Sequence, residues 1–475
     1  MKSNKNTVRG IVWFFFSNLF PACSALLIFS LASRLISPSD LGAVAFATTI
    51  ATILTSFCAV GFGDALIQKE KINFKHLETV LFLCVFFSFS IYIISNFVFI
   101  FSDYHVFNGV FRDVYPFISI KIIIDSCAIV PLSYLTREME FKSIALRTIF
   151  GSVMSFLLCI PIIYFGGGVW AIVVSQLTTS FVSFTILMVS AKIKFKIKFN
   201  KLEYNELSRF GITTTITKLI TSINIDNLLI GFLANATTLG LYAFSRRIFS
   251  VLSDILNNAI ANVSYPLYSA RKDNIDNLRE VFFKTTFMSA LISLPAFCGL
   301  ILIVPYLIPL AFGQQWSAAV PVVQLCCCIG LISCIGALQM SLIKGLGHTG
   351  WILKYQIIQQ LLTAIVVIIF AKSGATILML AITIKTICVW PLSVGYVLKL
   401  LDVGVFKYLS NFMKPMFAVI LMVCLGYFLE VSLINNSKLL VMFIIIISSF
   451  VVYILLTFLI ARKDMLECIR LVNNK

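Results

Sequence analysis

The stretch from Arg34 to Phe46 reads Arg-Leu-Ile-Ser-Pro-Ser-Asp-Leu-Gly-Ala-Val-Ala-Phe and joins two long apolar runs. Its proline predicts the end of the first helix, because proline lacks the amide hydrogen that a helix interior needs. Ser39 or Asp40 is then expected to accept the free amide hydrogens at the start of the next helix. We therefore predict a tight turn between two helices at residues 37–40.

The same pattern recurs from Leu233 to Phe244, 198 residues further along the chain. Five identities fall at equivalent positions of the two stretches: Leu35 and Leu233, Leu41 and Leu239, Gly42 and Gly240, Ala45 and Ala243, Phe46 and Phe244. A turn that recurs near the middle of the chain predicts an internal repeat. One difference is that Arg34 is matched by Phe232. Arg34 is expected to be either an anchor at the membrane interface or a periplasmic-side contact for substrate, and we favour the anchor.

The composition is that of a membrane protein. Of the 475 residues, 60% are hydrophobic and 12% are charged, whereas soluble domains carry about 25% charged residues. Apolar runs of about 20 residues, long enough to cross a bilayer as helices, recur from end to end. The runs are continuous, which does not fit the alternating pattern of a β-barrel. We predict an all-α integral membrane protein.

We count about fourteen spans. Their expected bounds are 10–36, 41–66, 77–101, 114–135, 143–165, 168–191, 209–234, 238–263, 282–312, 317–343, 351–371, 375–399, 411–431 and 438–461. Short connections alternate with longer, basic ones, so the charges indicate the orientation. With the N-terminus in the cytoplasm, 28 of the 37 Lys and Arg residues fall on the cytoplasmic side. Only Arg34, Arg112, Lys372 and Lys438 fall on the opposite side, so both termini are predicted to be cytoplasmic.

The segment Lys192–Phe199 alternates lysine with apolar residues and follows the sixth span. As an extended ribbon it would place its lysines near anionic headgroups on the cytoplasmic leaflet. It is expected either to anchor a linker or to guide an anionic lipid toward the pore.

Six spans precede this linker. Because six is an even number, both halves of the chain enter the membrane from the cytoplasm, as parallel repeats. We predict an N-lobe (1–200), a C-lobe (201–400) and a C-terminal helix pair (401–475).

The sequence contains no convincing motif for cofactor binding, metal binding or catalysis. Gly345–Gly350 matches Gly-x-Gly-x-x-Gly, but it joins two apolar spans and lacks the strand that a dinucleotide site requires. The 13 cysteines lie mostly in apolar runs and form no Cys-x-x-Cys pair, so packing is expected rather than metal binding. We therefore expect no catalytic residues, no metal and no nucleic-acid partner, and assign the positive net charge of +17 mostly to membrane orientation.

Charged and amide side chains inside the spans are the candidate functional residues, because a charge in a bilayer is costly and usually faces a cavity or a partner. Lys121 and Asp125 are four residues apart and are expected to pair. Lys218 and Asp226 are eight apart, close to one helix face. The candidate substrate-binding cations are Lys121, Lys218, Arg246, Arg247 and Lys385, the polar cavity residues are Asn224, Asn227 and Asn257, and the ion-coupling candidates are Asp125, Asp226 and Asp254. A cationic cavity suits a phosphate or pyrophosphate.

The sequence resembles the bacterial polysaccharide transporters, which include the Wzx-type flippases for O-antigen and exopolysaccharide repeat units. The resemblance covers nearly the whole chain and is fairly specific to the branch that includes colanic-acid exporters. It rests on Arg34–Gly42, Gly61–Gln68, Arg137–Lys142, Gly168–Ala171, Arg209–Gly211, Asp226–Gly231 and Leu239–Ala243. Multidrug and toxic compound extrusion carriers and the lipid II flippase belong to the same superfamily.

The resemblance implies a fold and a function. It implies two six-helix lobes in a V around a central cavity, with two further C-terminal helices. It also implies alternating-access transport of undecaprenyl-pyrophosphate-linked oligosaccharides from the cytoplasmic to the periplasmic leaflet of the bacterial inner membrane. Membrane lipids, a polysaccharide polymerase and glycosyltransferases are the implied partners, and H⁺ or Na⁺ the implied coupling ion, with no other cofactor.

Two other functions stay open on the sequence alone. A multidrug or cation antiporter of the same fold should have an acidic, aromatic cavity. The excess of basic over acidic residues inside the spans argues against this function, but only if those basic residues face the cavity. A membrane glycan polymerase or ligase usually carries a large periplasmic loop. Here the longest outer loop, at about residues 102–113, is short for a catalytic loop. We expect a transporter and not an enzyme.

Overall fold

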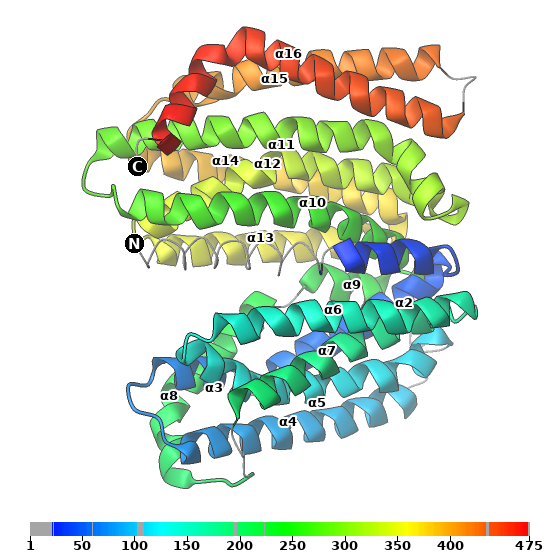
Figure 1. Cartoon of the computed structure of the whole chain (residues 1–475), viewed down its shortest axis with the longest axis vertical. Helices are drawn as coiled ribbons and strands as arrows, with labels where there is room; N and C mark the ends of the chain where they lie inside the picture. The colour runs from blue at the N-terminus through cyan, green and yellow to red at the C-terminus, as the bar shows by residue number, and fades with distance from the viewer. Residues whose placement is uncertain are drawn as a thin grey trace. The chain divides into compact units, whose positions relative to one another are not determined.

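The computed structural model describes residues 21, 23–58, 60–101, 109–192, 197–222, 224–433 and 437–473. Within these ranges the secondary structure consists of helices and turns (Figure 1). This agrees with the predicted all-α membrane protein, because a backbone in lipid must satisfy its own hydrogen bonds. The chain forms two compact units, Met1–Gly240 and Leu241–Lys475.

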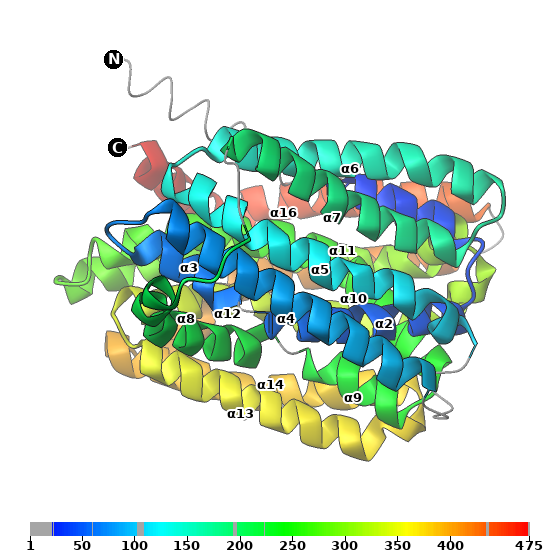
Figure 2. The same ribbon diagram turned by 90° about the horizontal axis from the view of Figure 1, so that it is seen from below.

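The first unit begins, in its described part, with the apolar helix Cys23–Ser33. Helix α7 packs on both α5 and α6, and α5 also packs on α2 and α4 (Figures 1 and 2). The helices of this unit are α2 (Pro38–Ser56), α3 (Val60–Gln68), α4 (Phe74–Phe101), α5 (Val110–Arg137), α6 (Phe141–Tyr164), α7 (Val169–Ala191), α8 (Lys201–Ser222) and α9 (Ile225–Leu233).

Helix α10 (Ala236–Ser269) begins in the first unit and continues into the second. In the second unit, α11 packs on α12, α15 and α16, while α14 packs on α12 and α13 (Figure 1). The other helices of this unit are α11 (Ile275–Ala311), η2 (Gln314–Ala319), α12 (Val320–Gly345), α13 (Thr349–Phe370), η3 (Ala371–Ser373), α14 (Ala375–Leu401), α15 (Val405–Ser432) and α16 (Lys438–Asn473).

The core of the second unit contains a buried polar chain. Ser393 Oγ donates to Gln339 Oε1 at 2.8 Å, and Gln339 Nε2 donates to Tyr408 Oη at 2.9 Å. All three residues are fully buried, where a polar group without a partner would be costly. These two hydrogen bonds therefore hold α12, α14 and α15 together in a fixed register.

Eleven helices in the described part of the chain are long and apolar enough to cross a membrane. They correspond to eleven of the predicted spans, with α2 supplying most of the second. The remaining predicted spans match the helix Cys23–Ser33, the pair α8 and α9, and α10, while part of the first span lies outside the described residues. The structure is thus consistent with about fourteen spans.

The turn before α2 differs in register from the prediction. The first helix ends at Ser33, and Pro38 is the first residue of α2 rather than the terminator of the first helix. Proline suits this position, because its fixed φ is helical and its missing N–H would have no helical acceptor there. Ser37, not Ser39 or Asp40, is the cap: its Oγ accepts the amide hydrogen of Asp40 at 3.2 Å.

The repeated stretch has the same local structure. Asn235, 198 residues after Ser37, accepts the amide hydrogen of Thr238 on its Oδ1 at 2.8 Å. Helix α10 begins one residue later, just as α2 begins one residue after Ser37. An asparagine and a serine therefore form equivalent caps, which supports an internal repeat.

The two repeated stretches also contact each other through their glycines. A Cβ atom added to Gly42 would lie 1.9 Å from the carbonyl oxygen of Ala236, and one added to Gly240 would lie 1.7 Å from that of Pro38. Pro38 and Ala236 are equivalent in the repeat, so the contact is reciprocal. The starts of α2 and α10 can approach this closely only because both positions are glycine.

Two predicted spans are broken helices. The second span is divided into α2 and α3 around Phe57 and Cys58, and the seventh into α8 and α9 near Asn224. Helix α3 of the second span packs against α8 of the seventh. Gly61 N donates to Thr215 Oγ1 at 3.0 Å, and a Cβ on Gly61 would lie 2.2 Å from Thr215 N. Broken helices often form binding sites in transporters, because their free backbone groups need partners.

The predicted lysine-rich ribbon falls partly outside the described residues, at 193–196. Its last residues, 197–199, are neither helical nor in a strand. The ring of Phe199 lies 5.6 Å from that of Phe82 on α4 and 5.7 Å from that of Tyr204 on α8. Asn200 N donates to Thr79 Oγ1 at 3.3 Å, so the end of this linker is held on α4.

Candidate functional site

The first group of charges lies on α5 and α6. Lys121 Nζ donates to Asp125 Oδ2 at 2.7 Å, and both side chains are about one-third exposed. This confirms the predicted pair, which forms because residues four apart share a helix face. Arg147 of α6 is attracted to Asp125. The charge count placed Arg147 with the cytoplasmic cations, but it lies in the second turn of α6, next to the pair.

The second group lies on α3 and α8. Lys218 Nζ lies 2.7 Å from Asp64 Oδ2, and these side chains are 37% and 38% exposed. The close packing of Gly61 on α8 brings the two helices near enough for this pair to form. Asp64 was not among the predicted site residues, although a carboxylate inside a span is itself a signal for a functional or paired residue.

Lys218 and Asp226 were expected on one face of a continuous helix, and the structure corrects this expectation, because they lie on two separate helices. Helix α8 ends at Ser222 and α9 begins at Ile225. Asp226 instead lies in the first turn of α9, where the helix dipole favours a carboxylate. Asn224 is the N-cap residue of α9, and Asn227 has a buried Oδ1 with no hydrogen-bond partner within the described residues. These polar groups gather at the helix break.

Helix α10 carries the third group, in the second unit. Arg247 is attracted to Asp254, seven residues away on the same helix face. Arg246 lies close enough to Cys326 of α12 to interact with it electrostatically. Asn257 Nδ2 donates to Ser253 Oγ at 2.9 Å, and its Oδ1 is buried with no hydrogen-bond partner in the described part of the chain.

The fourth group surrounds Lys385 on α14. Its Nζ donates to Gln359 Oε1 at 3.0 Å and to Thr363 Oγ1 at 2.9 Å, both on α13. A neutral amide and a hydroxyl therefore solvate this ammonium within the second unit.

The structure thus brings some predicted residues together and not others. Lys121 forms an ion pair with Asp125 on α5, and Arg247 interacts electrostatically with Asp254 on α10. The candidate cations are divided between the first and second units, so their shared cavity stays a prediction. Asp64 and Arg147 are the additions, and they show that pairing with carboxylates is a main feature of the cations in the first unit.

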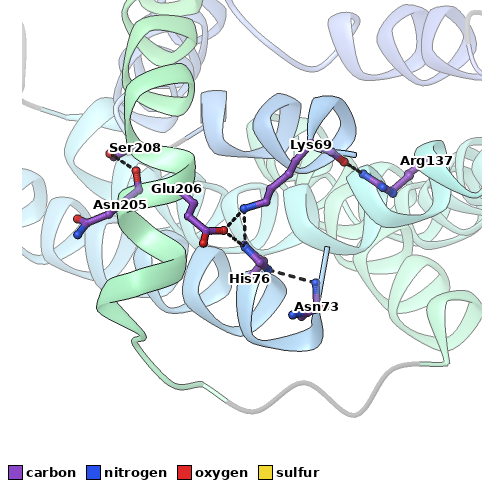
Figure 3. Close-up of polar contacts among 7 residues, drawn as sticks. All are labelled: Lys69, Asn73, His76, Arg137, Asn205, Glu206 and Ser208. Carbon is purple, nitrogen blue, oxygen red and sulfur yellow. Dashed lines mark hydrogen bonds and ion pairs between the residues drawn. The ribbon is translucent and has the colours of Figure 1, made fainter. Parts of the chain in front are cut away.

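A polar cluster outside the spans joins α3, α4 and α8 (Figure 3). The ammonium of Lys69 donates to Glu206, and His76 Nε2 lies 3.0 Å from the same carboxylate oxygen. His76 Nδ1 accepts the amide hydrogen of Asn73 at 3.1 Å, so Nε2 carries the proton of the neutral ring and donates to Glu206. His76 thus caps the start of α4 in the manner of a capping box.

Arg137 of α5 contacts the backbone near Lys69, next to this cluster (Figure 3). Its guanidinium donates to the backbone carbonyls of Leu66, Lys69 and Glu70 at the end of α3. These carbonyls have no partner within their own helix, and a planar guanidinium with five donors can satisfy several of them at once. The residue belongs to the stretch Arg137–Lys142 that the sequence singled out, and its role here is to hold helix ends.

The Glu206 carboxylate gives a test of this cluster. Its pKa is lowered by hydrogen bonds from Lys69 and His76 and by the Lys69 charge. A carboxylate with a lower pKa in the folded state stabilises the fold above its unfolded pKa, and this contribution is lost as the pH falls through the folded pKa. Glu206→Gln should therefore lower the melting temperature at neutral pH, and the difference from wild type should vanish in acid.

The measurement is thermal unfolding of the purified protein across the acid range, with Glu280→Gln as control. Glu280 pairs with Lys284, four residues away on α11. A pair within one helix joins no second element and contributes little. A wild-type-to-Glu206→Gln difference that persists unchanged below the pKa of Glu206 would contradict the assignment.

The chain is similar in sequence and in structure to known proteins. A family model described as "Polysaccharide biosynthesis protein" matches residues 31–321, more than half of the chain. The chain belongs to the polysaccharide biosynthesis protein family. The match covers both repeated stretches and the first three charged groups, so the repeat and most candidate residues lie within the part that defines the family.

Two curated relatives are similar to this chain over more than half of its length. The lipopolysaccharide biosynthesis protein WzxC of Escherichia coli is 22% identical over 388 residues, covering 79% of this chain and 77% of WzxC. The teichuronic acid biosynthesis protein TuaB of Bacillus subtilis is 24% identical over 282 residues, and this match spans 58% of this chain and only 57% of TuaB.

Solved structures show the fold. A structure of the lipid II flippase MurJ, in an inward closed conformation, matches 96% of this chain and all of that chain with a TM-score of 0.77 at 15% identity. An inward-facing multidrug resistance transporter of the MATE family matches 82% of this chain and 98% of that chain with a TM-score of 0.62, also at 15% identity. This member of the polysaccharide biosynthesis protein family therefore has the fold of these two transporters.

Proposed function

We propose that this protein is a flippase that moves lipid-linked oligosaccharides from the cytoplasmic to the periplasmic leaflet of the bacterial inner membrane. The observation that carries the proposal is the family match over residues 31–321. It is supported by relatives named for lipopolysaccharide and teichuronic acid biosynthesis and by a fold shared with a lipid II flippase. A multidrug antiporter has only the fold in its favour.

The in-span charges suit an undecaprenyl-pyrophosphate carrier. A large polar headgroup cannot cross hydrocarbon without polar partners. Lys121, Lys218 and Lys385 each have ammonium hydrogens that a pyrophosphate oxygen would accept beside or instead of their present partners. At Lys121 and Lys218 the pyrophosphate would replace a carboxylate, so these lysines have an anionic partner both with and without substrate.

Coupling to an ion gradient would use carboxylates of the same groups. Asp125, Asp226 and Asp254 are the candidates, because a carboxylate in a low-dielectric site exchanges a proton as its charged partner changes. Both termini are proposed to be cytoplasmic on the basis of the charge asymmetry. Glycosyltransferases would supply the lipid-linked substrate and a polymerase would consume it.

A leaflet-resolved assay tests the function. In a strain from which the gene is deleted, lipid-linked repeat units should accumulate in the cytoplasmic leaflet, and the wild-type chain should restore their appearance in the periplasmic leaflet. Normal periplasmic delivery in the deletion strain, with no second flippase present, would refute the proposal. Loss of drug resistance with normal polysaccharide would instead favour the antiporter.

A further inference from the structure

The surface of the first unit contains an apolar groove between α5, α6 and α7, with a volume of about 560 Å³. These three helices pack side by side (Figures 1 and 2). The lining is aliphatic and aromatic except for the hydroxyl of Thr178, and its main side chains are Ile120, Ile124, Phe150, Met154, Leu158 and Phe181. Such a groove accepts hydrocarbon and offers almost nothing to a polar ligand.

The groove is open along its length. Phe150, Met154 and Leu158 form a stripe on α6 and are 49%, 45% and 51% exposed. The stripe covers eight residues, or about 12 Å of helix at 1.5 Å per residue. It is therefore long enough to hold an extended section of a chain rather than a single methyl group.

One edge of this groove is charged. On α5, Ile120 and Ile124 are each followed directly by a member of the Lys121–Asp125 pair. On α6, Arg147 precedes Phe150 by three residues and Met154 by seven, so it continues the same stripe. Lys121 pairs with Asp125, and Arg147 interacts electrostatically with the same carboxylate. Two cations and one carboxylate therefore lie beside the groove, with a net positive charge.

The cations at this edge have hydrogens to give. Lys121 has three N–H donors, one of which is used by Asp125. Arg147 Nε is buried and has no hydrogen-bond partner within the described residues. An anion with several oxygens could accept from both residues while Asp125 keeps its place.

The depth of the edge decides between kinds of lipid. Lys121 lies eleven residues from the start of α5 and sixteen from its end, which is about 16 Å and about 24 Å along the helix axis. The phosphate of an ordinary phospholipid stays in the headgroup region, outside a hydrocarbon core of about 30 Å. A phosphate that reaches Lys121 therefore belongs to a molecule that is crossing the membrane.

We infer that this groove holds the polyisoprenoid chain of the lipid-linked substrate, with its phosphate or pyrophosphate between Lys121 and Arg147. The inference rests on the proposed function and deepens it by assigning the lipid part of the substrate to the first unit. The apolar stripe binds the chain by burying its surface, and the charged edge selects a polyprenyl phosphate from neutral lipids.

The test uses the purified full-length protein and undecaprenyl phosphate that carries a photoreactive group on its chain. Mass spectrometry should locate the label on α6 and α7 within the groove. Leu158→Trp should reduce this labelling at least about fivefold by filling the groove. Ile365→Trp is the matched control, because Ile365 is 52% exposed on α13, and labelling of the groove should not change.

The charged edge is tested by affinity. Arg147→Gln should weaken binding of undecaprenyl phosphate about tenfold, since a charge-assisted pair is lost, while Arg147→Lys should keep much of the affinity. Unlabelled undecaprenyl phosphate should displace the probe, and phosphatidylglycerol at the same concentration should not. Unchanged melting temperatures would show that the variants are folded.

Two results would overturn the inference: label spread evenly over the membrane helices, or equal displacement by phosphatidylglycerol. Either result leaves the flippase proposal intact if the leaflet assay still shows transport by the wild-type chain. The flippase proposal itself fails if deletion leaves delivery normal, whatever the labelling shows. The binding and leaflet assays therefore distinguish the two failures.

Discussion

Replacing Gly42 with alanine should lower the melting temperature of the purified protein and abolish its complementation of the deletion strain. The added Cβ would lie 1.9 Å from the Ala236 carbonyl oxygen, far inside contact distance, and that oxygen is part of the backbone and cannot rotate away. The starts of α2 and α10 would have to separate. Overpacking of this kind costs about 1–3 kcal/mol, and Gly240→Ala should have the same effect because the contact is reciprocal.

The matched control changes the sign of the effect. Gly336 lies inside α12, and a Cβ there would meet nothing within 4 Å. Gly336→Ala should raise stability slightly, by about 0.5–1 kcal/mol, because alanine loses less backbone entropy in a helix. Thermal unfolding of the three variants tests this directly. Equal shifts for Gly42→Ala and Gly336→Ala would show that the two stretches are not in contact in the folded protein.

The same contact shows what the sequence could reveal about the fold. Spacing and identity of the repeated stretch predicted equivalent turns, and equivalent caps at Ser37 and Asn235 support the repeat. The contact between the turns could not be foreseen, because a glycine in a turn is explained locally by backbone freedom. Only the position of Ala236 reveals that Gly42 also makes room for another helix.

Long apolar runs predicted the helices well, because backbone hydrogen bonding in lipid leaves few alternatives. The helix break near Asn224 was missed, since the polar residues Asn224, Asp226 and Asn227 were assigned to a cavity and not to a break in the helix. As a result, the sequence aligned Lys218 with Asp226, while the structure pairs Lys218 with Asp64, 154 residues earlier. Pairs four apart on one helix, such as Lys121 and Asp125, follow from spacing, whereas pairs between helices depend on tertiary packing.

The largest effect on transport is expected at the pair of Asp64 and Lys218. Asp64→Asn and Lys218→Ala should each reduce the transport rate at least about tenfold, since each removes one charge of the 2.7 Å ion pair inside the predicted membrane region. Both side chains are more than one-third exposed, so the cost in stability should be about 1–3 kcal/mol, below that of breaking a fully buried pair.

A charge swap separates pairing from substrate binding. The double variant Asp64→Lys with Lys218→Asp rebuilds an ion pair but moves the cation from α8 to α3. If the pair only holds α3 to α8, the swap should restore both melting temperature and transport. We expect the melting temperature to recover and transport to stay low, because the proposed pyrophosphate contact needs a cation on α8.

Asp276→Asn is the matched control for this experiment. Asp276 pairs with Arg279 on α11 and its side chain is 90% exposed, so its loss should change neither quantity measurably. Full transport by the swapped protein would remove Lys218 from the substrate path and leave it a structural residue. Low transport with a recovered melting temperature would instead place the cation of α8, next to a helix break, among the groups that handle the substrate.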